Sequence, residues 1–303
     1  MIRALVTGSR GQVGAELLRA LDGRARVIAR DRASLDLSDP DAIRRCVREE
    51  RPQLIVNAGA YTAVDKAESE LDAARAVNAR APGVLAGEAK RLGAFLVHFS
   101  TDYVFDGTKP GPYVETDPTS PVNAYGLSKL EGEEAIRAAG CDHLVLRTSW
   151  VYGAHGRNFL LTMLRLAATH PEIRVVDDQR GAPTSSRQIA QGMVDLVLGS
   201  ARGRPMEEGD LDRLRRASGT YHYTAGGVAS WFEFAQAIFA ERSTQQGQAF
   251  NAPHVVGIPT RDYPTPAKRP ANSVLSNEKL AATFGVRLPA WRDGLREALS
   301  ALA

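Results

Sequence analysis

The chain has 303 residues, of which 44% are hydrophobic and 24% charged, the balance of a globular protein with one large or two modest domains. Its 38 basic and 35 acidic residues are scattered in both signs, without a Lys/Arg-rich run that carries interleaved aromatics. This pattern does not predict nucleic-acid binding. No apolar run approaches the roughly 20 residues that cross a bilayer, so we also expect no membrane span.

The first half of the chain alternates short apolar runs with helical stretches. Strands are expected at residues 2–7, 25–30, 53–59, 94–100 and 143–149, and a helix capped by Asp39 follows the second of them. These strands are rich in Val, Ile and Leu without clean alternation, which indicates burial on both faces. The sequence therefore predicts an α/β fold with a doubly wound parallel sheet of the Rossmann type over residues 1–150.

After about residue 150 this rhythm breaks, and helices mix with pieces punctuated by Pro and Gly. Such a composition suits loops that line a site. We expect residues 151–303 to form mainly a smaller C-terminal α/β substrate domain, some of whose segments return to the Rossmann sheet. The charged stretch 200–216 is interpreted as a solvated insertion.

Two features of the chain indicate where it works. Cys46 and Cys141 are the only cysteines, and they show neither a disulfide framework nor the spacing of metal ligands. The first residues enter a strand within a few positions, which leaves no room for a signal peptide. We therefore expect a cytoplasmic protein, where thiols stay reduced.

A glycine-rich turn follows the first strand. In "VTGSRGQVGAEL", Gly8, Gly11 and Gly14 lie between that strand and the first helix. Glycine allows the backbone to turn sharply and to approach a phosphate, while the helix N-terminus offers free N–H groups. The spacing is GxxGxxG, which as a bare pattern also fits a tight structural turn. In this strand–turn–helix context it predicts binding of a dinucleotide pyrophosphate.

The end of the second strand bears on the choice of dinucleotide. An NAD-binding fold favours an acidic residue there to bond the ribose 2′-hydroxyl. Here the strand ends in Arg30, Asp31 is next, and Arg10 lies within the glycine turn. The two arginines favour a 2′-phosphate and hence NADPH, while Asp31 keeps NADH open.

A tyrosine and a lysine are four residues apart in "NAYGLSKLEGEEA". Tyr125 and Lys129 share one face of the expected helix. A free tyrosine has a pKa of about 10, and a nearby ammonium favours the phenolate. Such a pair can pass a proton to a carbonyl oxygen while hydride arrives at its carbon. Thr101 and Asp102 follow a strand's carboxyl end, where ligands bind in open α/β sheets.

On these residues the chain resembles the extended short-chain dehydrogenase/reductases, and among them the dTDP-4-dehydrorhamnose reductases. The segments that carry the resemblance run in order along nearly the whole chain. They are residues 56–70, "STDYVFDG" (100–107), "TSPVNAYGLSK" (119–129), "RTSWVYG" (147–153), "DDQRGAPTS" (177–185), 219–235 and "RPANSVLS" (269–276).

The resemblance implies a reaction: hydride delivery to C4 of dTDP-4-dehydro-L-rhamnose to give dTDP-L-rhamnose for cell-surface polysaccharide. Tyr125 would be the general acid, Lys129 would tune its pKa and bond the nicotinamide ribose, and Thr101 would bond the sugar carbonyl. Asp102 and Trp150 would contact the deoxysugar. The remaining cofactor contacts would be Gly11, Gln12 and Val13 at the pyrophosphate, Asp36 and Leu37 by the adenine, and Ala60, Tyr61 and Thr62 along the cofactor.

The chain departs from the family in two ways: the stretch 200–216 goes beyond the family's usual core, and an acidic position differs. Some members pair subunits through acidic residues around a magnesium ion, and Glu16 matches one of them, but the helix after "GAPT" begins "SSRQIAQG", a stretch with Arg187 and no acid. We therefore predict no tightly held metal, and either a monomer or a homodimer.

Rival interpretations remain for the whole chain and for single residues. The related 4,6-dehydratases carry Glu where this chain has Tyr103, which disfavours dehydration, while nucleotide-sugar epimerases share the scaffold. The regulatory subunit of methionine adenosyltransferase is similar but has serine in place of Thr101 and lacks Trp150. Trp150 could instead close the core, and His98, within an apolar strand, is interpreted as a core histidine with satisfied hydrogen bonds rather than a catalytic one.

Overall fold

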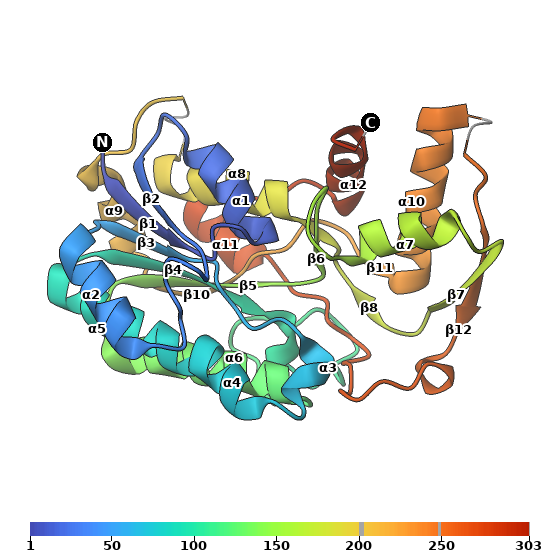
Figure 1. Ribbon diagram of the computed structural model, residues 1–303, viewed down its shortest axis with the longest axis horizontal. Coiled ribbons are helices and arrows are strands. Elements are labelled where there is room, and N and C mark those ends of the chain that lie inside the picture. The colour runs from blue at the N-terminus through green and yellow to red at the C-terminus, as the bar shows by residue number, and fades with distance from the viewer. Residues whose placement is uncertain (200–202, 248–249, 303) are drawn as a thin grey trace.

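A computed structural model describes residues 1–199, 203–247 and 250–302 and places a parallel sheet between two layers of helices (Figure 1). Its six strands lie in the order β10-β5-β4-β3-β1-β2, and every pair is parallel. The strands are β1 (Arg3–Thr7), β2 (Arg26–Arg30), β3 (Leu54–Asn57), β4 (Phe95–Thr101), β5 (His143–Thr148) and β10 (Gly219–His222). From β1 the chain first adds β2 on one side and then β3 on the other, which confirms the predicted doubly wound α/β fold.

The two helix layers cover the two faces of this sheet because its strands, apart from the edge strand β2, bury side chains on both sides. One face packs against α1 (Gln12–Leu21), α8 (Ser186–Leu198), α9 (Glu208–Arg215) and α11 (Glu278–Phe284). The other face packs against α2 (Pro40–Glu50), α5 (Ala81–Leu92) and α6 (Ala124–Ala139). A further helical run leads into α5: α3 (Val64–Ala67), α4 (Leu71–Arg75) and the π-helical turn η1 (Ala76–Arg80).

Polar side chains cap the N-termini of α2 and α6. The Asp39 carboxylate accepts hydrogen bonds from the backbone N–H groups of Asp41 and Ala42 at the start of α2, which confirms the expected cap. Asn123 likewise accepts a bond from the N–H of Gly126 and starts α6. The cap therefore sets the residue at which α6 begins, and with it the direction in which the side chains of Tyr125 and Lys129 project from the helix.

A second group of elements lies beside the sheet, on the right in Figure 1, and has its own apolar cluster. Its helices are α7 (Phe159–Ala167), α10 (Trp231–Gln246) and α12 (Trp291–Ser300). Its strands pair as β7 (Glu172–Val176) with β12 (His254–Ile258), β8 (Arg180–Gly181) with β11 (Ala229–Ser230), and β6 (Val151–Tyr152) with β9 (Thr184–Ser185). Short 3₁₀ turns are η2 (Asp102–Val104) and η4 (Thr260–Asp262). None of the helices within the described ranges is both long and apolar enough to cross a membrane.

Segments after residue 150 cross back to the first sheet. Strand β10 pairs with β5, and α8 packs on the same sheet face as α1. Residues 200–202 lie outside the described residues, but the rest of the stretch interpreted as a solvated insertion contributes Met206, Leu211 and Leu214 to the core. That interpretation is therefore wrong for 203–216, because two leucines three positions apart give α9 an apolar face.

Candidate active site

The glycine turn between β1 and α1 leaves no room for side chains. Gly8 has φ +64°, and a Cβ there would lie 2.5 Å from Gly59 Cα. A Cβ on Gly14 would lie 2.1 Å from the Gly8 carbonyl oxygen, so the turn and the helix are packed backbone to backbone. Gly11 is the N-cap of α1 and supplies no side-chain cap, which leaves N–H groups of the first turn open for an anion.

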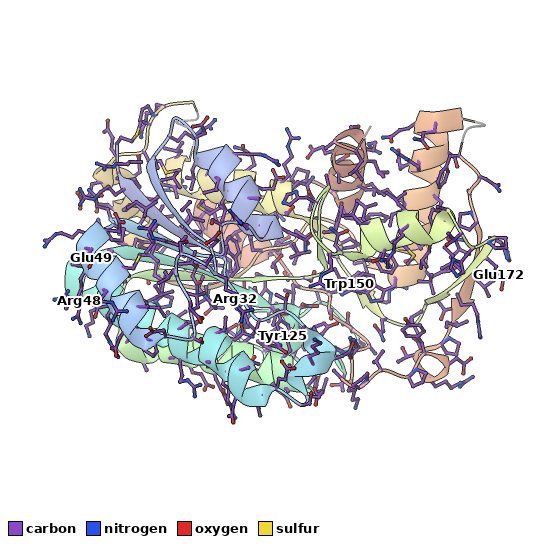
Figure 2. All side chains as sticks on the ribbon, in the orientation of Figure 1. Arg32, Arg48, Glu49, Tyr125, Trp150 and Glu172 are labelled. Atoms are coloured by element: carbon purple, nitrogen blue, oxygen red, sulfur yellow. The ribbon has the colours of Figure 1, made fainter. Side chains whose placement is uncertain are left out.

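A cavity of about 620 Å³ opens at the carboxyl ends of β1, β3, β4 and β5, within the roughly 300–1,000 Å³ of ligand pockets. It brings together most of the residues that the sequence nominates for the cofactor. These are Gly8, Gly11, Gln12, Val13, Asp36, Leu37, Ala60, Tyr61, Thr62, Tyr125 and Lys129. Figure 2 shows Arg32 and Tyr125 at this end of the sheet, with Trp150 on the side of the second group of elements.

The adenosine end of this cavity differs from the sequence interpretation at one arginine. Arg30 does not line the cavity and instead forms an ion pair with Glu50, with 2.5 Å between nitrogen and oxygen. Arg32, which the sequence analysis missed, lines the cavity together with Arg10 and Asp31. Arg32 lies in a turn after β2, where strand alternation no longer applies, so no local sequence signal marks it.

Asp31 is already engaged by its neighbours. Its carboxylate accepts bonds from the hydroxyl and the backbone N–H of Ser34 and lies 2.9 Å from Arg10 Nε. The hydrogen bonds from Ser34 and the charge of Arg10 hold the pKa of Asp31 below its usual value. An Asp31 held in this way is less free to accept the hydroxyl of a ribose.

The loop after β3 is held by a residue that the sequence analysis did not single out. Asn78, on the π-helical turn η1, accepts a bond from Tyr61 N–H at 2.9 Å and donates to the Tyr61 carbonyl at 3.0 Å. Its amide also donates to Ser128 Oγ on α6. Asn78 thus ties the cofactor-side loop to the helix of Tyr125, and π-helical turns are frequent at functional sites. No local sequence signal marks it.

Tyr125 and Lys129 both line the cavity, from α6. Burial, with the nearby charge of Asp102, raises the pKa of Tyr125 to about 12, while a hydrogen bond from Thr101 acts the other way. Burial lowers the pKa of Lys129 to about 8, and Glu133 opposes that shift. The sequence argument expected the ammonium to lower the pKa of Tyr125. Here the phenol is held protonated, which is the state a proton donor needs.

Thr101 and Asp102 lie next to this pair but do not line the cavity. Thr101 Oγ1 donates to Asp102 Oδ1 at 2.9 Å, and both residues are buried. Burial raises the pKa of Asp102 to about 7, although hydrogen bonds from Ser273 and Thr101 oppose the shift. The two side chains adjoin the Tyr125 hydroxyl, where a carbonyl oxygen would receive its proton.

Trp150 leaves the end of β5 toward the second group of elements. Its backbone has φ +47°, a conformation that is uncommon outside glycine and costs roughly 1–3 kcal/mol. The indole stacks on that of Trp231, and a Cβ on Gly181 would lie 2.6 Å from the Trp150 ring. Trp150 is therefore held beside the cavity rather than in it.

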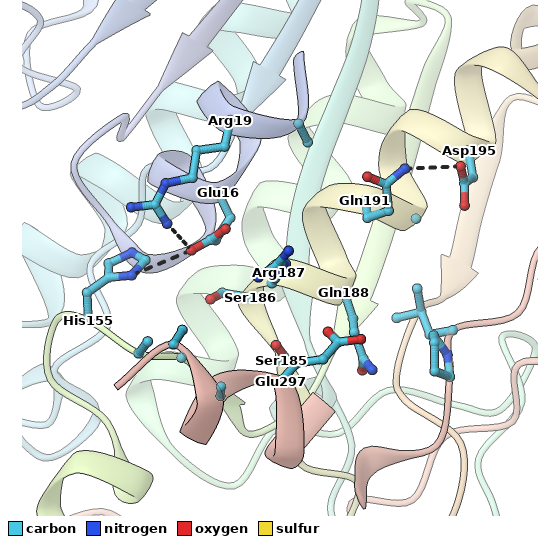
Figure 3. A pocket seen from close by; sticks show the side chains of 18 of the residues that line it. Glu16, Arg19, His155, Ser185, Ser186, Arg187, Gln188, Gln191, Asp195 and Glu297 are labelled. Atoms are coloured by element: carbon cyan, nitrogen blue, oxygen red, sulfur yellow. Dashed lines mark hydrogen bonds and ion pairs between the residues drawn. The ribbon is translucent and has the colours of Figure 1, made fainter. Parts of the chain in front are cut away.

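A second cavity, of about 890 Å³, lies between α1, α8 and α12 (Figure 3). Glu16 points into it but is paired with Arg19 at 2.5 Å and lies 3.6 Å from His155 Nδ1, while Arg187 comes from the start of α8. Across the part of the chain that the structure describes, no three His, Cys, Asp or Glu residues are grouped to hold a metal ion.

Residues 2–303 match the family described as RmlD substrate binding domain. This chain belongs to the RmlD family. Among curated RmlD relatives, the dTDP-4-dehydrorhamnose reductase of Burkholderia thailandensis is 50% identical over 96% of each chain, and that of Escherichia coli K12 is 41% identical over 98% and 97%. The resemblance stated from the sequence is confirmed.

Solved structures of RmlD relatives have the same fold. A dTDP-4-dehydrorhamnose reductase from Clostridium acetobutylicum matches with a TM-score of 0.89 and 37% identity, covering 99% of both chains. That of Bacillus anthracis, in complex with NADP, matches with a TM-score of 0.87 and 33% identity over 99% of both chains. A UDP-glucose 4-epimerase of Thermus thermophilus, at 22% identity and TM-score 0.78, shares the fold alone.

Proposed function

We propose that this chain reduces the C4 ketone of dTDP-4-dehydro-L-rhamnose to dTDP-L-rhamnose with NADPH. The observation that carries the proposal is the placement of Tyr125 and Lys129 in the same cavity as the glycine turn. A proton donor and a pyrophosphate cradle at one sheet edge are what a dinucleotide-dependent ketoreductase needs. The relatives named dTDP-4-dehydrorhamnose reductase support the choice of sugar.

The chain's own residues would handle the proton. NADPH supplies the hydride when it is bound. Tyr125, held protonated by burial, donates its proton to the C4 oxygen. The Thr101 hydroxyl, which donates to Asp102 in the free protein, would turn its one proton to the same oxygen. Lys129 stabilises the phenolate that remains, because a positive charge nearby favours the charged form of the tyrosine. Its pKa of about 8 allows it to be charged at neutral pH.

Three observations support NADPH over NADH. Arg10 and Arg32 both line the adenosine end of the cavity, and Asp31 is engaged by Ser34 and Arg10. Guanidinium groups suit a phosphate, whereas an acid free to accept a hydroxyl suits a bare ribose. The Bacillus anthracis relative, solved in complex with NADP, supports this choice.

The substrate side of the proposal uses the rest of the chain. Residues 1–150 would bind the dinucleotide, and residues 151–303 would mainly bind the nucleotide-sugar, with Asp102 and Trp150 at the deoxysugar. The stack of Trp150 on Trp231 joins the two parts where a substrate would span them. We propose action in the cytoplasm, as a monomer or homodimer and without a tightly held metal, to supply sugar for cell-surface polysaccharide.

The test is oxidation of NADPH by the purified protein, followed by absorbance, with dTDP-4-dehydro-L-rhamnose supplied by the preceding epimerase. Tyr125→Phe should lower kcat by about 10²–10⁴, the usual contribution of general acid catalysis. Tyr221→Phe is the matched control, because Tyr221 is also a buried tyrosine, and its hydroxyl donates to Ala217 O outside the cavity. No turnover by folded wild-type protein that binds NADPH would overturn the proposal and favour a binding or regulatory role.

A further inference from the structure

A row of buried polar side chains runs behind Lys129 through the middle of the sheet. Thr7, Asn57 and His98 are register partners on the neighbouring strands β1, β3 and β4, so they lie side by side. Thr7 Oγ1 is 2.6 Å from Asn57 Oδ1, Asn57 Nδ2 is 2.9 Å from His98 Nδ1, and His98 Nε2 is 3.1 Å from Lys129 Nζ. All four residues are at most 1% exposed. Polar groups buried to this extent need hydrogen-bond partners.

The ammonium of Lys129 has three protons and can only donate. One goes to the Phe99 carbonyl at 2.6 Å, and His98 Nε2 lies in position to accept a second. These are the two hydrogen-bond partners of Lys129 Nζ within the described residues. The third proton is left for the cavity that Lys129 lines. Two fixed partners therefore orient the proton that faces a ligand.

The charge of Lys129 determines the protonation of the whole row. Because Nε2 must accept, the neutral His98 ring carries its proton on Nδ1. Nδ1–H must then donate to the Asn57 amide oxygen, so the amide is turned by half a turn from the orientation given above and its NH₂ donates to Thr7 Oγ1. Rotation of the amide by half a turn exchanges these two atoms without moving the others. Thr7 Oγ1 also accepts from the N–H of Gly59, which lies beside the glycine turn.

The other charged or titratable side chains near Lys129 are bound by partners of their own or act on other residues. Glu133, one turn along α6, is bound by Arg147 through two nitrogens and by Ser100 Oγ. His143 on β5, the register partner of Leu96, acts on His98 only through its charge and contacts the Cys141 carbonyl, while Asp102 acts on Tyr125. The neutral ring of His98 is therefore the side chain that holds the ammonium in place. Burial and the charge of Lys129 keep the pKa of His98 well below its usual value, so the ring stays neutral.

We propose that His98 is a positioning residue for Lys129: its neutral Nδ1–H tautomer, held by Asn57, accepts a hydrogen bond from the ammonium and directs it at the ligand. The role rests on the proposed reductase function. It goes beyond the core histidine that the sequence suggests, because the ring is placed by its contact with a site residue and not by packing alone.

The first experiment compares His98→Leu with His98→Gln in the reductase assay over a range of pH. Loss of the acceptor disfavours charged Lys129, so in His98→Leu the alkaline limb of kcat/KM should move down by about one pH unit, the size expected for one hydrogen bond to a charged group. Glutamine can place an amide oxygen near Nε2 and should restore most of the profile. His143→Leu is the matched control, since His143 is also buried on a sheet strand but does not contact Lys129.

A merely structural histidine would give a different result. His98→Leu would then unfold more readily, but its folded fraction would keep the wild-type pH profile, and that outcome would overturn the proposal. Equal shifts in His98→Leu and His143→Leu would overturn it as well.

A second measurement does not depend on turnover. In ¹⁵N-labelled wild-type protein, the nitrogen shifts of His98 should report the Nδ1–H tautomer at neutral pH. An Nε2–H tautomer would contradict the role, because that nitrogen could not accept from Lys129. If the wild-type protein proved inactive, the proposed function would fail, while the tautomer would still test the contact.

Discussion

The indole rings of Trp150 and Trp231 are stacked, with centroids 3.6 Å apart and planes inclined by 6°. Trp150 follows the end of β5, whereas Trp231 is the first residue of α10, after a capping box between Ser230 and Glu233. Trp231 also packs on Phe159 of α7, with centroids 4.7 Å apart. An aromatic column therefore connects the carboxyl edge of the Rossmann sheet to the core of the second group of elements.

This stack predicts a loss of substrate affinity when Trp231 is truncated. Trp231→Leu should free the strained Trp150 and raise the KM for the nucleotide-sugar about tenfold, in line with the energy of an aromatic pair. The Kd for NADPH should not change, because Trp231 does not line the cofactor cavity. Trp231→Phe keeps a ring and should stay near wild type. An unchanged KM in the leucine variant would show that Trp150 does not contribute to binding of the nucleotide-sugar.

Cofactor preference should depend on Arg32 and not on Arg30. Arg32→Ala should weaken binding of NADP⁺ by about 10–100-fold, the cost of losing a hydrogen bond between charged groups, and leave NAD⁺ binding nearly unchanged. Arg30→Ala is the control, since Arg30 pairs with Glu50 outside the cavity. Calorimetric titration with both dinucleotides measures this. A larger effect in the Arg30 variant would favour the original sequence interpretation.

Stability should depend on pH through Asp102. The raised pKa means that folded protein holds the proton up to about pH 7, whereas the unfolded chain releases it near its usual value. Folding stability attributable to Asp102 therefore falls as pH rises between about pH 4 and about pH 7, by up to about 4 kcal/mol. Asp102→Asn should remove this loss. In urea denaturation, the free energy of unfolding of the variant should therefore rise relative to that of wild type from about pH 4 to about pH 7.

Asp106 provides a control of opposite sign. Its pKa is lowered by hydrogen bonds from Thr108 and Tyr113, so its contribution is present above the unfolded pKa and lost as pH falls. Asp106→Asn should therefore become less stable relative to wild type as pH rises toward about 4, and the difference should stay constant between about pH 4 and about pH 7. Parallel behaviour of the two variants would contradict the assignment of the pH dependence to burial of Asp102.

Two glycines in helices should respond oppositely to alanine. In Gly14→Ala the new Cβ would meet the Gly8 carbonyl at 2.1 Å, so the variant should lose about 1–3 kcal/mol of stability and bind NADPH more weakly. Gly87, within α5, has nothing within 4 Å of an added Cβ, so Gly87→Ala should gain about 0.5–1 kcal/mol. Thermal unfolding with and without NADPH separates the two. Equal effects would show that the turn tolerates a side chain.

The sequence by itself determined the features that depend on neighbouring residues. Buried strand patterns, the Asp39 cap, the glycine turn and the spacing of Tyr125 and Lys129 all follow from local backbone geometry and periodicity. These features are enough to indicate the fold class and the end of the sheet where a ligand binds, because parallel strands bring their carboxyl ends together.

Only the tertiary structure decided which side chains meet. Asn78 and Tyr61 are 17 residues apart, His98 and Lys129 are 31 apart, and Trp150 meets Trp231 from another part of the chain. Such contacts depend on the register of the sheet and on how the helices and the second group of elements pack against it. Local sequence carries no signal for them, since a polar residue in an apolar strand is equally compatible with several partners until packing selects one.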